Sequence, residues 1–403
     1  MAVVYLDNNA TTRVDPRVVQ TMLPFFTESF GNASSTHDYG AAVAPALKDA
    51  RKQVQALLGA EFDHEIVFTS GGTESDNAAI LSALEASPHR REVVTSTVEH
   101  PAVLSLCSWL EKNNGIRVHL IPVDGKGRLD LDAYESALSD RVAVVSMMWA
   151  NNETGTIFPV AALADKAKAV GALFHTDAVQ AVGKVSLDLK SAAVDMLSLS
   201  GHKLHAPKGI GALYVRRGTR FRPQIRGGHQ ERGRRAGTEN TPGIVALGKA
   251  AQLAAAHLAE QDTRIRALRD RLEKGLVQRI GRSFVTGDLD HRLPNTANVA
   301  FEDVEGEAIL LLLDRAGIAV SSGSACTPGS PEPSHVLRAM KVPRTSVHGA
   351  IRFSLSRENT DEEVDRVLDA MPGIVAKLRD ASGFWPQDAA PEESVSALHE
   401  AVV

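Results

Sequence analysis

Short apolar runs alternate with longer stretches of helical periodicity through the first half of the chain. Runs of four to six residues that are apolar enough to be buried strands occur at 65–69, 92–95, 143–148, 172–176, 196–199 and 211–215. Two stretches, 42–58 and 160–170, have the periodicity of amphipathic helices. Because continuous apolar strands are separated by helices, the pattern predicts an α/β fold with a mostly parallel sheet flanked by helices.

The pattern changes after a break near residues 245–262. Beyond this break, one helical face carries apolar side chains, at Ile265, Leu268, Leu272 and Leu276. Gly281 is a natural end for this helix, and its heptads are too irregular for a coiled coil. We expect the helix to join a large domain, 16–260, to a smaller α+β domain formed by 1–15 and 261–385.

Composition narrows the class of protein. The 403 residues are 43% hydrophobic and 23% charged, which fits a globular protein with room for two domains. The net charge of −5 gives no general reason to expect nucleic acid or an anionic membrane as a partner. The sequence predicts neither a signal peptide nor a membrane-spanning helix, so we expect a cytoplasmic protein. Residues 386–403 are polar and rich in Pro and Ala, which indicates a mobile tail.

Two motifs match two needs of pyridoxal phosphate chemistry. Lys203 follows Ser200, Gly201 and His202, and a lysine amine can form a Schiff base with the cofactor's aldehyde. Asp177 ends a predicted strand, and a buried aspartate can keep the pyridine nitrogen protonated so that the ring accepts electrons. Taken separately, the lysine could be a solvated loop charge and the aspartate a turn cap. Their occurrence together favours the cofactor.

A glycine-rich turn, 69–75, follows a strand and opens a helical stretch. Gly72 allows close backbone approach, Thr73 adds a hydroxyl donor, and a helix N-terminus presents free N–H groups to an anion. The spacing does not match a P-loop or a dinucleotide motif. The turn therefore predicts a site for a single phosphate, with a simple helix cap as the alternative.

Three polar side chains follow other strands of the predicted sheet. His100 could stack on a cofactor ring and move protons, although it could also be a structural histidine before a proline-started helix. Asn152 could hold a substrate carboxylate at the carboxyl end of a strand, or belong to a simple turn. Gln180 lies three residues after Asp177 and could bond the cofactor's phenolic oxygen.

Eight arginines lie within residues 216–235. No nucleic-acid-binding motif accompanies them, so a solvated or ion-paired loop is favoured over a nucleic-acid patch. The alternative is a contact between subunits that ends in a phosphate-binding Thr238.

The two cysteines differ in their surroundings and form neither a disulfide framework nor a zinc site. Cys107 lies in an apolar helical stretch, as a structural cysteine would. Cys326 lies in a loop rich in Ser, Gly and Pro, 321–333. An exposed thiol in such a loop predicts a nucleophile that reaches a substrate and then carries a group away.

Together these residues resemble the cysteine desulfurases, and most closely the nitrogen-fixation type. The matching segments are 5–12, 69–77, 98–100, 151–155, 175–180, 200–208, 227–240, 321–327 and 351–356. The resemblance implies a homodimer with the fold-type I architecture of class-V aminotransferases.

The resemblance also implies a set of site residues. The cofactor contacts it implies are Lys203, Asp177, Gln180 and His100, with Gly72, Thr73, Ser200, Gly201 and His202 at the phosphate and Thr238 from the other subunit. Asn152 and Arg352 would bind the carboxylate of L-cysteine. Cys326 would take the sulfur as a persulfide, with release of L-alanine, and pass it to an iron–sulfur scaffold protein, for nitrogenase maturation. The Cys326 sulfur would transiently contact a nascent cluster.

Two other functions use parts of the same pattern. A selenocysteine lyase or an aminotransferase on this fold needs Lys203 but no cysteine in a loop. A non-enzymatic sulfur carrier needs Cys326 but no cofactor.

Overall fold

A computed structural model of the chain describes residues 3–322 and 333–382. Its main sheet has seven strands in the order β2-β8-β7-β6-β5-β3-β4. The strands are β2 (Ile66–Thr69), β3 (Glu92–Ser96), β4 (Arg117–Ile121), β5 (Val142–Ser146), β6 (Leu173–Asp177), β7 (Met196–Ser200) and β8 (Gly211–Val215). Only β8 runs antiparallel to its neighbours in this sheet. The predicted mostly parallel sheet is therefore confirmed.

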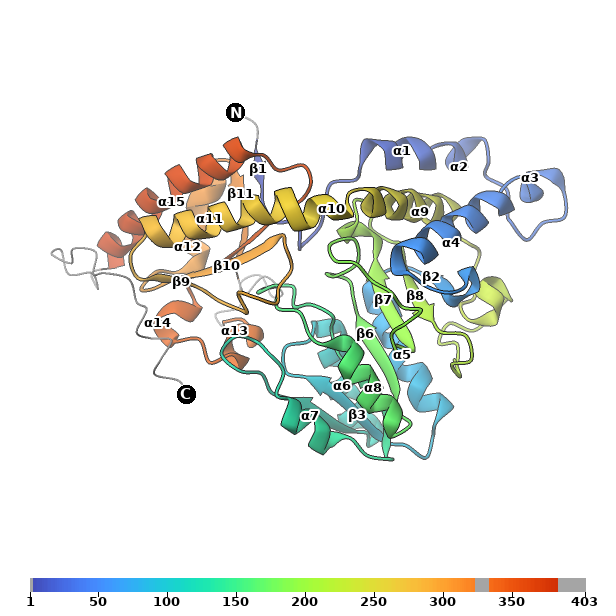
Figure 1. The fold of residues 1–403 in the computed structure, drawn as a ribbon. Helices are drawn as coiled ribbons and strands as arrows, with labels where there is room; N and C mark the ends of the chain where they lie inside the picture. Colours follow the sequence, from blue (N-terminus) through green and yellow to red (C-terminus); the bar gives the residue numbers. More distant parts are fainter. Residues whose placement is uncertain (1–2, 323–332, 383–403) are drawn as a thin grey trace.

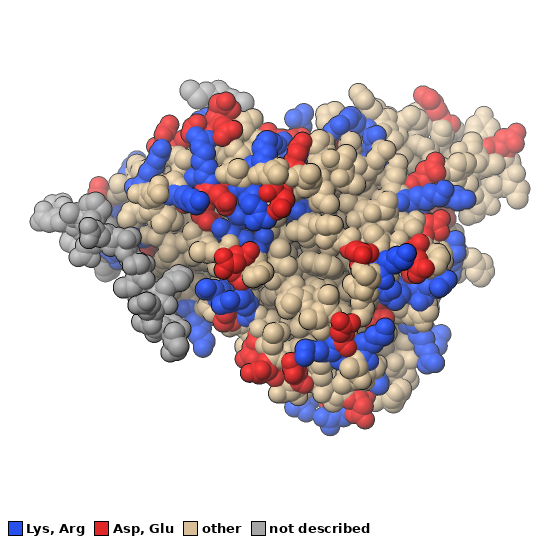
Figure 2. Space-filling view, viewed as in Figure 1, with Lys and Arg blue, Asp and Glu red and all other residues tan. Residues whose placement is uncertain are grey.

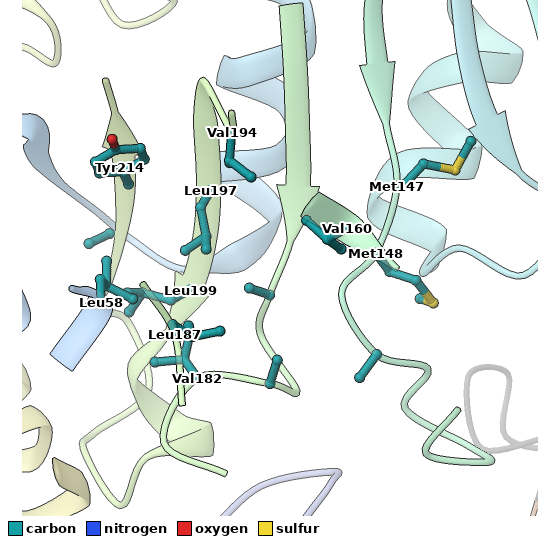
Figure 3. Packing of buried hydrophobic residues seen from close by; sticks show 14 of the residues in the cluster. Leu58, Met147, Met148, Val160, Val182, Leu187, Val194, Leu197, Leu199 and Tyr214 are labelled. Carbon is teal, nitrogen blue, oxygen red and sulfur yellow. The ribbon is translucent and has the colours of Figure 1, made fainter. Parts of the chain in front are cut away.

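Successive residues of the central strands face opposite sides of the main sheet. Val144 packs in one hydrophobic cluster with α5 (Gly72–Ala86) and α6 (Pro101–Asn114), whereas Val145 packs in the other with α4 (Ala44–Leu58) and α8 (Val160–Ala169). Figure 3 shows part of the second cluster, with Leu197 and Leu199 of β7 beside Leu58 of α4. This two-residue alternation covers both faces of the sheet and explains why the central strands are buried along nearly their whole length.

The C-terminal part has its own sheet and its own apolar cluster. A four-stranded sheet has the order β12-β13-β10-β9, and a parallel pair joins β1 to β11. The strands are β1 (Val4–Tyr5), β9 (Ser283–Val285), β10 (Thr296–Phe301), β11 (Ile318–Ala319), β12 (Ser321–Ser322) and β13 (Ala350–Ser354). The covering helices α11 (Arg266–Arg279), α12 (Gly306–Arg315) and α15 (Asp361–Ser382) lie on the left in Figure 1.

The N-terminal segment after β1 crosses from the C-terminal part to the main sheet. Asp7 bridges to Ser354 of β13, and the Asn9 main-chain N–H donates to Ser354 Oγ at 2.9 Å. Farther along, the Thr12 N–H donates to the His202 main-chain oxygen at 2.9 Å. Residues 7–12 therefore bring polar main-chain groups beside the segment that contains Lys203.

The predicted break at 245–262 is mostly wrong. Residues Thr241–Ala256 form α9, and α10 (Leu258–Glu260) and a π-helical segment (Gln261–Ile265) then lead into α11. Figure 1 shows α9, α10 and α11 in line across the molecule. Because α9 is buried on nearly every side, it has no polar stripe from which a periodicity could be read. The division into 16–260 and 261–385 remains a prediction, and the tail after 385 lies outside the described residues.

The remaining elements are short. They are α1 (Pro16–Met22), α2 (Pro24–Thr27), α3 (Asp38–Ala41), α7 (Leu131–Ala137), α13 (His335–Ala339) and α14 (Arg344–Val347), with 3-10 turns at Asp63–Glu65, Gly201–Lys203 and Gln230–Gly233. Across the described part of the chain, none of the helices is both long and apolar enough to cross a bilayer. Figure 2 shows acidic and basic side chains interspersed over α11 and α15, where Arg271 and Arg279 pair with Asp361 and Asp369.

Candidate active site at the carboxyl edge of the main sheet

Most of the predicted site residues follow strands that end at the same edge of the main sheet. His100 comes after β3, Asn152 after β5, Asp177 ends β6, and Lys203 follows β7. Because the carboxyl ends of parallel strands meet at one edge, residues far apart in sequence come together there. The sequence prediction of a shared site is consistent with this placement.

Lys203 ends the 3-10 turn after β7 and is held by the N-terminal segment. Its Nζ donates to the main-chain oxygens of Asn9 at 2.6 Å and Ala10 at 2.7 Å. Main-chain carbonyls accept hydrogen bonds without adding a negative charge. These two bonds therefore hold the Lys203 amine near the sheet edge through neutral acceptors.

Asp177 is buried at the end of β6. Its Oδ1 accepts the Val179 N–H at 2.9 Å, and within the described residues it forms no ion pair. Burial raises the pKa of the Asp177 carboxyl, and the positive charges of His100 and Lys203 act against that rise. Because no ion pair of the described residues neutralises it, the buried Asp177 carboxylate favours a bound group that carries positive charge.

His100 is the N-cap of α6. Its Nδ1 accepts the Ala102 N–H at 3.1 Å, so this nitrogen carries no proton and Nε2 carries the proton of the neutral ring. Burial lowers the pKa of His100, while Asp177 raises it and Lys203 lowers it further. The ring is therefore neutral at neutral pH in this environment and can accept a proton only by breaking the cap or by losing the Nε2 proton first.

The predicted phosphate residues lie together at the start of α5 and the end of β7. A Cβ on Gly72 would lie 3.7 Å from the Ser200 Cβ and only 2.9 Å from Val179 Cγ2. Only glycine fits here without displacing Val179. The first N–H groups of α5, including that of Thr73, have no acceptor within their own helix. Gly201 and His202 follow Ser200 directly. Burial lowers the pKa of His202 to about 4, with smaller contributions from the charges of Lys203 and Lys208.

Gln180 and Asn152 both contact the N-terminal segment through Asn9. Gln180 Nε2 donates to the Asn9 main-chain oxygen at 2.9 Å, and Asn9 Nδ2 donates to the Asn152 main-chain oxygen at 3.1 Å. Asn9 lay inside a recognised segment, but it received no role from the sequence. The only feature of the sequence that could have marked Asn9 as a site residue is the pair of amides, Asn8 and Asn9, shortly after a short apolar strand.

Arg352 lies on β13 and is buried. Nη1 donates to the Asn152 main-chain oxygen at 3.0 Å and Nη2 donates to Asp7 Oδ1 at 2.8 Å. Its Nε is buried with no hydrogen-bond partner among residues 3–322 and 333–382. A buried guanidinium with an unused donor is suited to a carboxylate ligand.

Three buried acidic groups behind the sheet edge were missed by sequence reasoning. Burial raises the pKa of Glu99 to about 8, and its carboxylate accepts the Met148 N–H at 3.0 Å. Burial and the charge of Asp177 raise the pKa of Asp76, which lies 3.6 Å from His175 Nε2. Burial likewise raises the pKa of Glu153 to about 7. No local pattern marks these groups, because the residues they contact, such as Met148, His175 and Ser334, lie far from them in the sequence.

Four of the eight arginines in 216–235 have side chains that are ion-paired or bonded to main-chain oxygens, and two of these, Arg216 and Arg234, bond main-chain oxygens. Arg226 pairs with Glu85 at 2.8 Å, and Arg235 pairs with Glu74 at 2.9 Å. Thr238 is exposed. The predicted ion-paired loop is thus observed, while the role of Thr238 remains a prediction.

The two cysteines have different outcomes. Cys107 is buried in α6, and burial followed by the charges of Glu99 and Glu111 raises its thiol pKa to about 12, as expected of a structural cysteine. Cys326 and its predicted loop function lie outside the described residues. In the described part of the chain, no three His, Cys, Asp or Glu side chains gather to hold a metal ion.

Comparison with known proteins shows the family to which the chain belongs. The family described as "Aminotransferase class-V" matches residues 4–367. A protein named "Cysteine desulfurase" from Gluconacetobacter diazotrophicus is 73% identical over 399 residues, covering 99% of this chain and 100% of that protein. "Cysteine desulfurase NifS" of Azotobacter vinelandii is 63% identical over 398 residues, covering 99% of each chain.

The solved structures agree with the sequence comparison. A structure described as "NIFS-LIKE PROTEIN" is 40% identical and superimposes with a TM-score of 0.87, covering 93% of this chain and 100% of that one. At this similarity the architecture is shared over nearly the whole chain.

Proposed function

Because the chain belongs to the aminotransferase class-V family, we infer that it is a cysteine desulfurase that converts L-cysteine to L-alanine. The observation that carries this function is the near full-length similarity to proteins of that name. We further propose that it supplies sulfur for iron–sulfur cluster assembly in nitrogen fixation, through a scaffold protein that accepts a persulfide. The name of the Azotobacter relative supports this pathway.

The residues at the sheet edge fit pyridoxal phosphate as the cofactor. The buried Asp177 carboxyl has no ion pair in the described residues, and a protonated pyridine nitrogen would supply the missing cation. Glycine at position 72 lets the start of α5 pack closely against Val179, and the N–H groups of this helix start would donate to the phosphate. Gly72, Thr73, Ser200, Gly201 and His202 would hold the phosphate, and Gln180 would donate to the phenolic oxygen.

Lys203 would hold the cofactor covalently through its amine. When bound, the cofactor supplies an electron-accepting ring that acidifies the Cα hydrogen of the amino acid. Lys203 or His100 then takes the Cα proton. His100 would also stack on the ring. Because its Nδ1 accepts the Ala102 N–H and its Nε2 carries a proton, His100 would take the Cα proton only after one of these two nitrogens is freed.

Arg352 and Asn152 would hold the carboxylate of L-cysteine. The unpartnered Nε of Arg352 supports this role, because a carboxylate oxygen would satisfy it. Holding the carboxylate fixes the Cα hydrogen relative to the proton acceptor.

Cys326 would act as the nucleophile. Its thiolate attacks the substrate sulfur, an S–S bond forms and the C–S bond of L-cysteine breaks. The carbon fragment keeps the electron pair, takes up protons and leaves as L-alanine, while Cys326 keeps the transferred sulfur as a persulfide. The Cys326 sulfur would also contact a nascent iron–sulfur cluster during transfer. A selenocysteine lyase on this fold would not need this thiol.

We propose a homodimer as the working form. Several large apolar side chains between residues 23 and 39 are exposed in the single chain, among them Leu23, Phe26, Phe30 and Tyr39. A second copy of the chain would cover them. In the dimer, Thr238 of one copy would reach the phosphate held by the other. Sedimentation of the purified protein tests this: a single species of twice the chain mass is expected, and a monomer would contradict the proposal.

The cofactor proposal is tested by reducing the purified protein with borohydride and mapping peptides by mass spectrometry. We expect the cofactor's mass on the peptide that contains Lys203, and a colourless protein for Lys203→Ala. Lys208→Ala, an exposed lysine on the same loop, is the control and should keep both the colour and the labelled peptide. Labelling that persists in Lys203→Ala would reject Lys203 as the attachment site.

A further inference from the structure

A second lysine is buried beside the candidate site and has no role in the mechanism above. Only 8% of Lys184 is exposed, and its Nζ donates to Gln180 Oε1 at 2.7 Å and to Asn9 Oδ1 at 3.0 Å. Both acceptors are neutral amides, and no carboxylate of the described residues forms an ion pair with this amine. A buried amine without a carboxylate is costly, which suggests a functional reason for its position.

The groups that face Lys184 are mainly cationic or neutral. Burial lowers the pKa of Lys184 well below its usual value, and the charges of Lys203 and Arg352 lower it further. His205 lies close enough for its own pKa to be lowered slightly by Lys184, after the larger effects of burial and Arg357. Lys184 and Lys203 also line the same cavity, together with Asn8 and Asn295. This surrounding favours a bound anion.

Lys184 and Asn9 fix the orientation of the Gln180 side-chain amide from both ends. The lysine amine donates to Oε1, and the Asn9 main-chain oxygen accepts from Nε2 at 2.9 Å. A flipped amide would place its oxygen against the Asn9 carbonyl oxygen and its N–H groups against the amine hydrogens. One N–H of Nε2 is used by Asn9, and the second is left for another acceptor.

We propose that Lys184 is a positioning residue that acts through Gln180, directing and strengthening the Gln180 N–H that donates to the cofactor's phenolic oxygen. This inference rests on the cofactor proposed above. An amide whose oxygen accepts a hydrogen bond is polarised and becomes a stronger donor at its nitrogen. Lys184 thereby stabilises the phenolic oxygen as an anion, at a distance from the reacting atoms.

The same contacts link Lys184 to the attachment lysine. The Asn9 side-chain oxygen accepts from Lys184, while its main-chain oxygen accepts from both Gln180 and Lys203. Loss of the Lys184 amine therefore releases Gln180 and loosens Asn9. Both changes act on the electronic state of the cofactor before any substrate is present.

The test is the pH titration of the cofactor's visible absorption in the purified holoenzyme, without substrate. Lys184→Met removes the amine, and Gln180→Leu removes the amide. Each is expected to raise the midpoint by about one pH unit, a tenfold change in the proton dissociation constant. The double variant should shift the midpoint no further than the larger single change, because the two residues act in one chain of hydrogen bonds.

Lys190→Met is the matched control, an exposed lysine six residues farther along the chain, and should leave the midpoint unchanged. Lys184→Gln keeps a donor for Gln180 and should shift the midpoint upward by a smaller amount, which preserves the test if Lys184→Met does not fold. An unchanged midpoint in the Lys184 variants, or additive shifts in the double variant, would overturn the inference. A wild-type protein without visible absorption would instead overturn the proposed cofactor, and this inference with it.

Discussion

Arg352 donates through Nη2 to Asp7 Oδ1 at 2.8 Å, which joins β13 to the N-terminal segment. Nη1 binds the main-chain oxygen of Asn152, and the buried Nε has no partner among the described residues. The guanidinium is thus held rigidly on two sides while one donor is left for a ligand. This arrangement suits a substrate carboxylate, which needs both a fixed charge and a free donor.

Arg352→Lys should therefore weaken substrate binding more than it slows the reaction. A lysine keeps the charge but cannot bond Asp7, Asn152 and a carboxylate in the same geometry. Loss of a hydrogen bond between charged groups costs roughly 1.5–3 kcal/mol, so we expect KM for L-cysteine to rise about tenfold to a hundredfold. Arg271→Lys is the control, since Arg271 of α11 pairs with Asp361 at 2.9 Å and does not line the cavity beside Lys203. Equal KM values for the two variants would argue against the carboxylate role.

Asp177→Asn should retain the cofactor but lose most activity. Asparagine cannot supply the negative charge that keeps a pyridine nitrogen protonated, while Lys203 is unchanged. We expect kcat to fall by about a hundredfold or more, equivalent to a barrier increase of roughly 3 kcal/mol. The measurement is kcat normalised to bound cofactor. Asp195→Asn changes a partly buried aspartate that accepts the Phe174 N–H at 2.8 Å, and should keep kcat near that of the wild type. A similar loss in both variants would point to general destabilisation.

Glu99 should make the stability of the protein depend on pH. Burial raises the pKa of its carboxyl to about 8 from the usual 4.5. Since the folded state holds this proton more tightly than the unfolded state, the resulting stability is fully present below about pH 4.5 and is lost as the pH rises towards about 8. Glu99→Gln cannot ionise, so its melting temperature should fall less than that of the wild type across this window.

The size of this effect is on the order of a few kcal/mol for a shift of this direction and extent. Thermal unfolding followed at a series of pH values gives the difference in slope between variant and wild type. Glu111→Gln, an exposed change on α6, should leave the slope as it is. Parallel curves for Glu99→Gln and the wild type would show that Glu99 is ionised equally in both states.

Cys107 should be dispensable for sulfur transfer. Its thiol is buried and burial raises its pKa to about 12, so almost no thiolate is present at neutral pH. We expect Cys107→Ala to lose about 1 kcal/mol of stability from the small cavity and to form alanine at the wild-type rate. Cys326→Ala should abolish desulfuration. If the losses were reversed between the two variants, the nucleophile would have been assigned to the wrong cysteine.

The sequence predicted those features that are local. The strands that end at Thr69, Asp177 and Ser200 are buried along nearly their whole length because both faces of the main sheet are covered, and the short apolar runs within them are visible without any structure. The site residues lie at or soon after the ends of such strands, as Lys203, Asp177 and His100 do. The strand pattern and the chemical motifs therefore pointed to the same edge of the sheet.

The features that were missed depend on packing between distant segments. Lys184 and Asn9 are 175 residues apart in the chain and meet only after the N-terminal segment crosses to the main sheet. Helix α9 was overlooked because its burial on nearly every side removes the polar stripe that defines an amphipathic helix. The phosphate contact proposed for Thr238 would be made in a second chain, and no pattern within one chain specifies such a contact.

The most direct test of the desulfurase mechanism is a single anaerobic turnover of the purified protein with L-cysteine, followed by intact-protein and peptide mass spectrometry. The account predicts one additional sulfur on the peptide that contains Cys326, with L-alanine formed in equal amount. Alanine without sulfur on that peptide would contradict the role of Cys326, and the absence of alanine would contradict the assignment as a cysteine desulfurase.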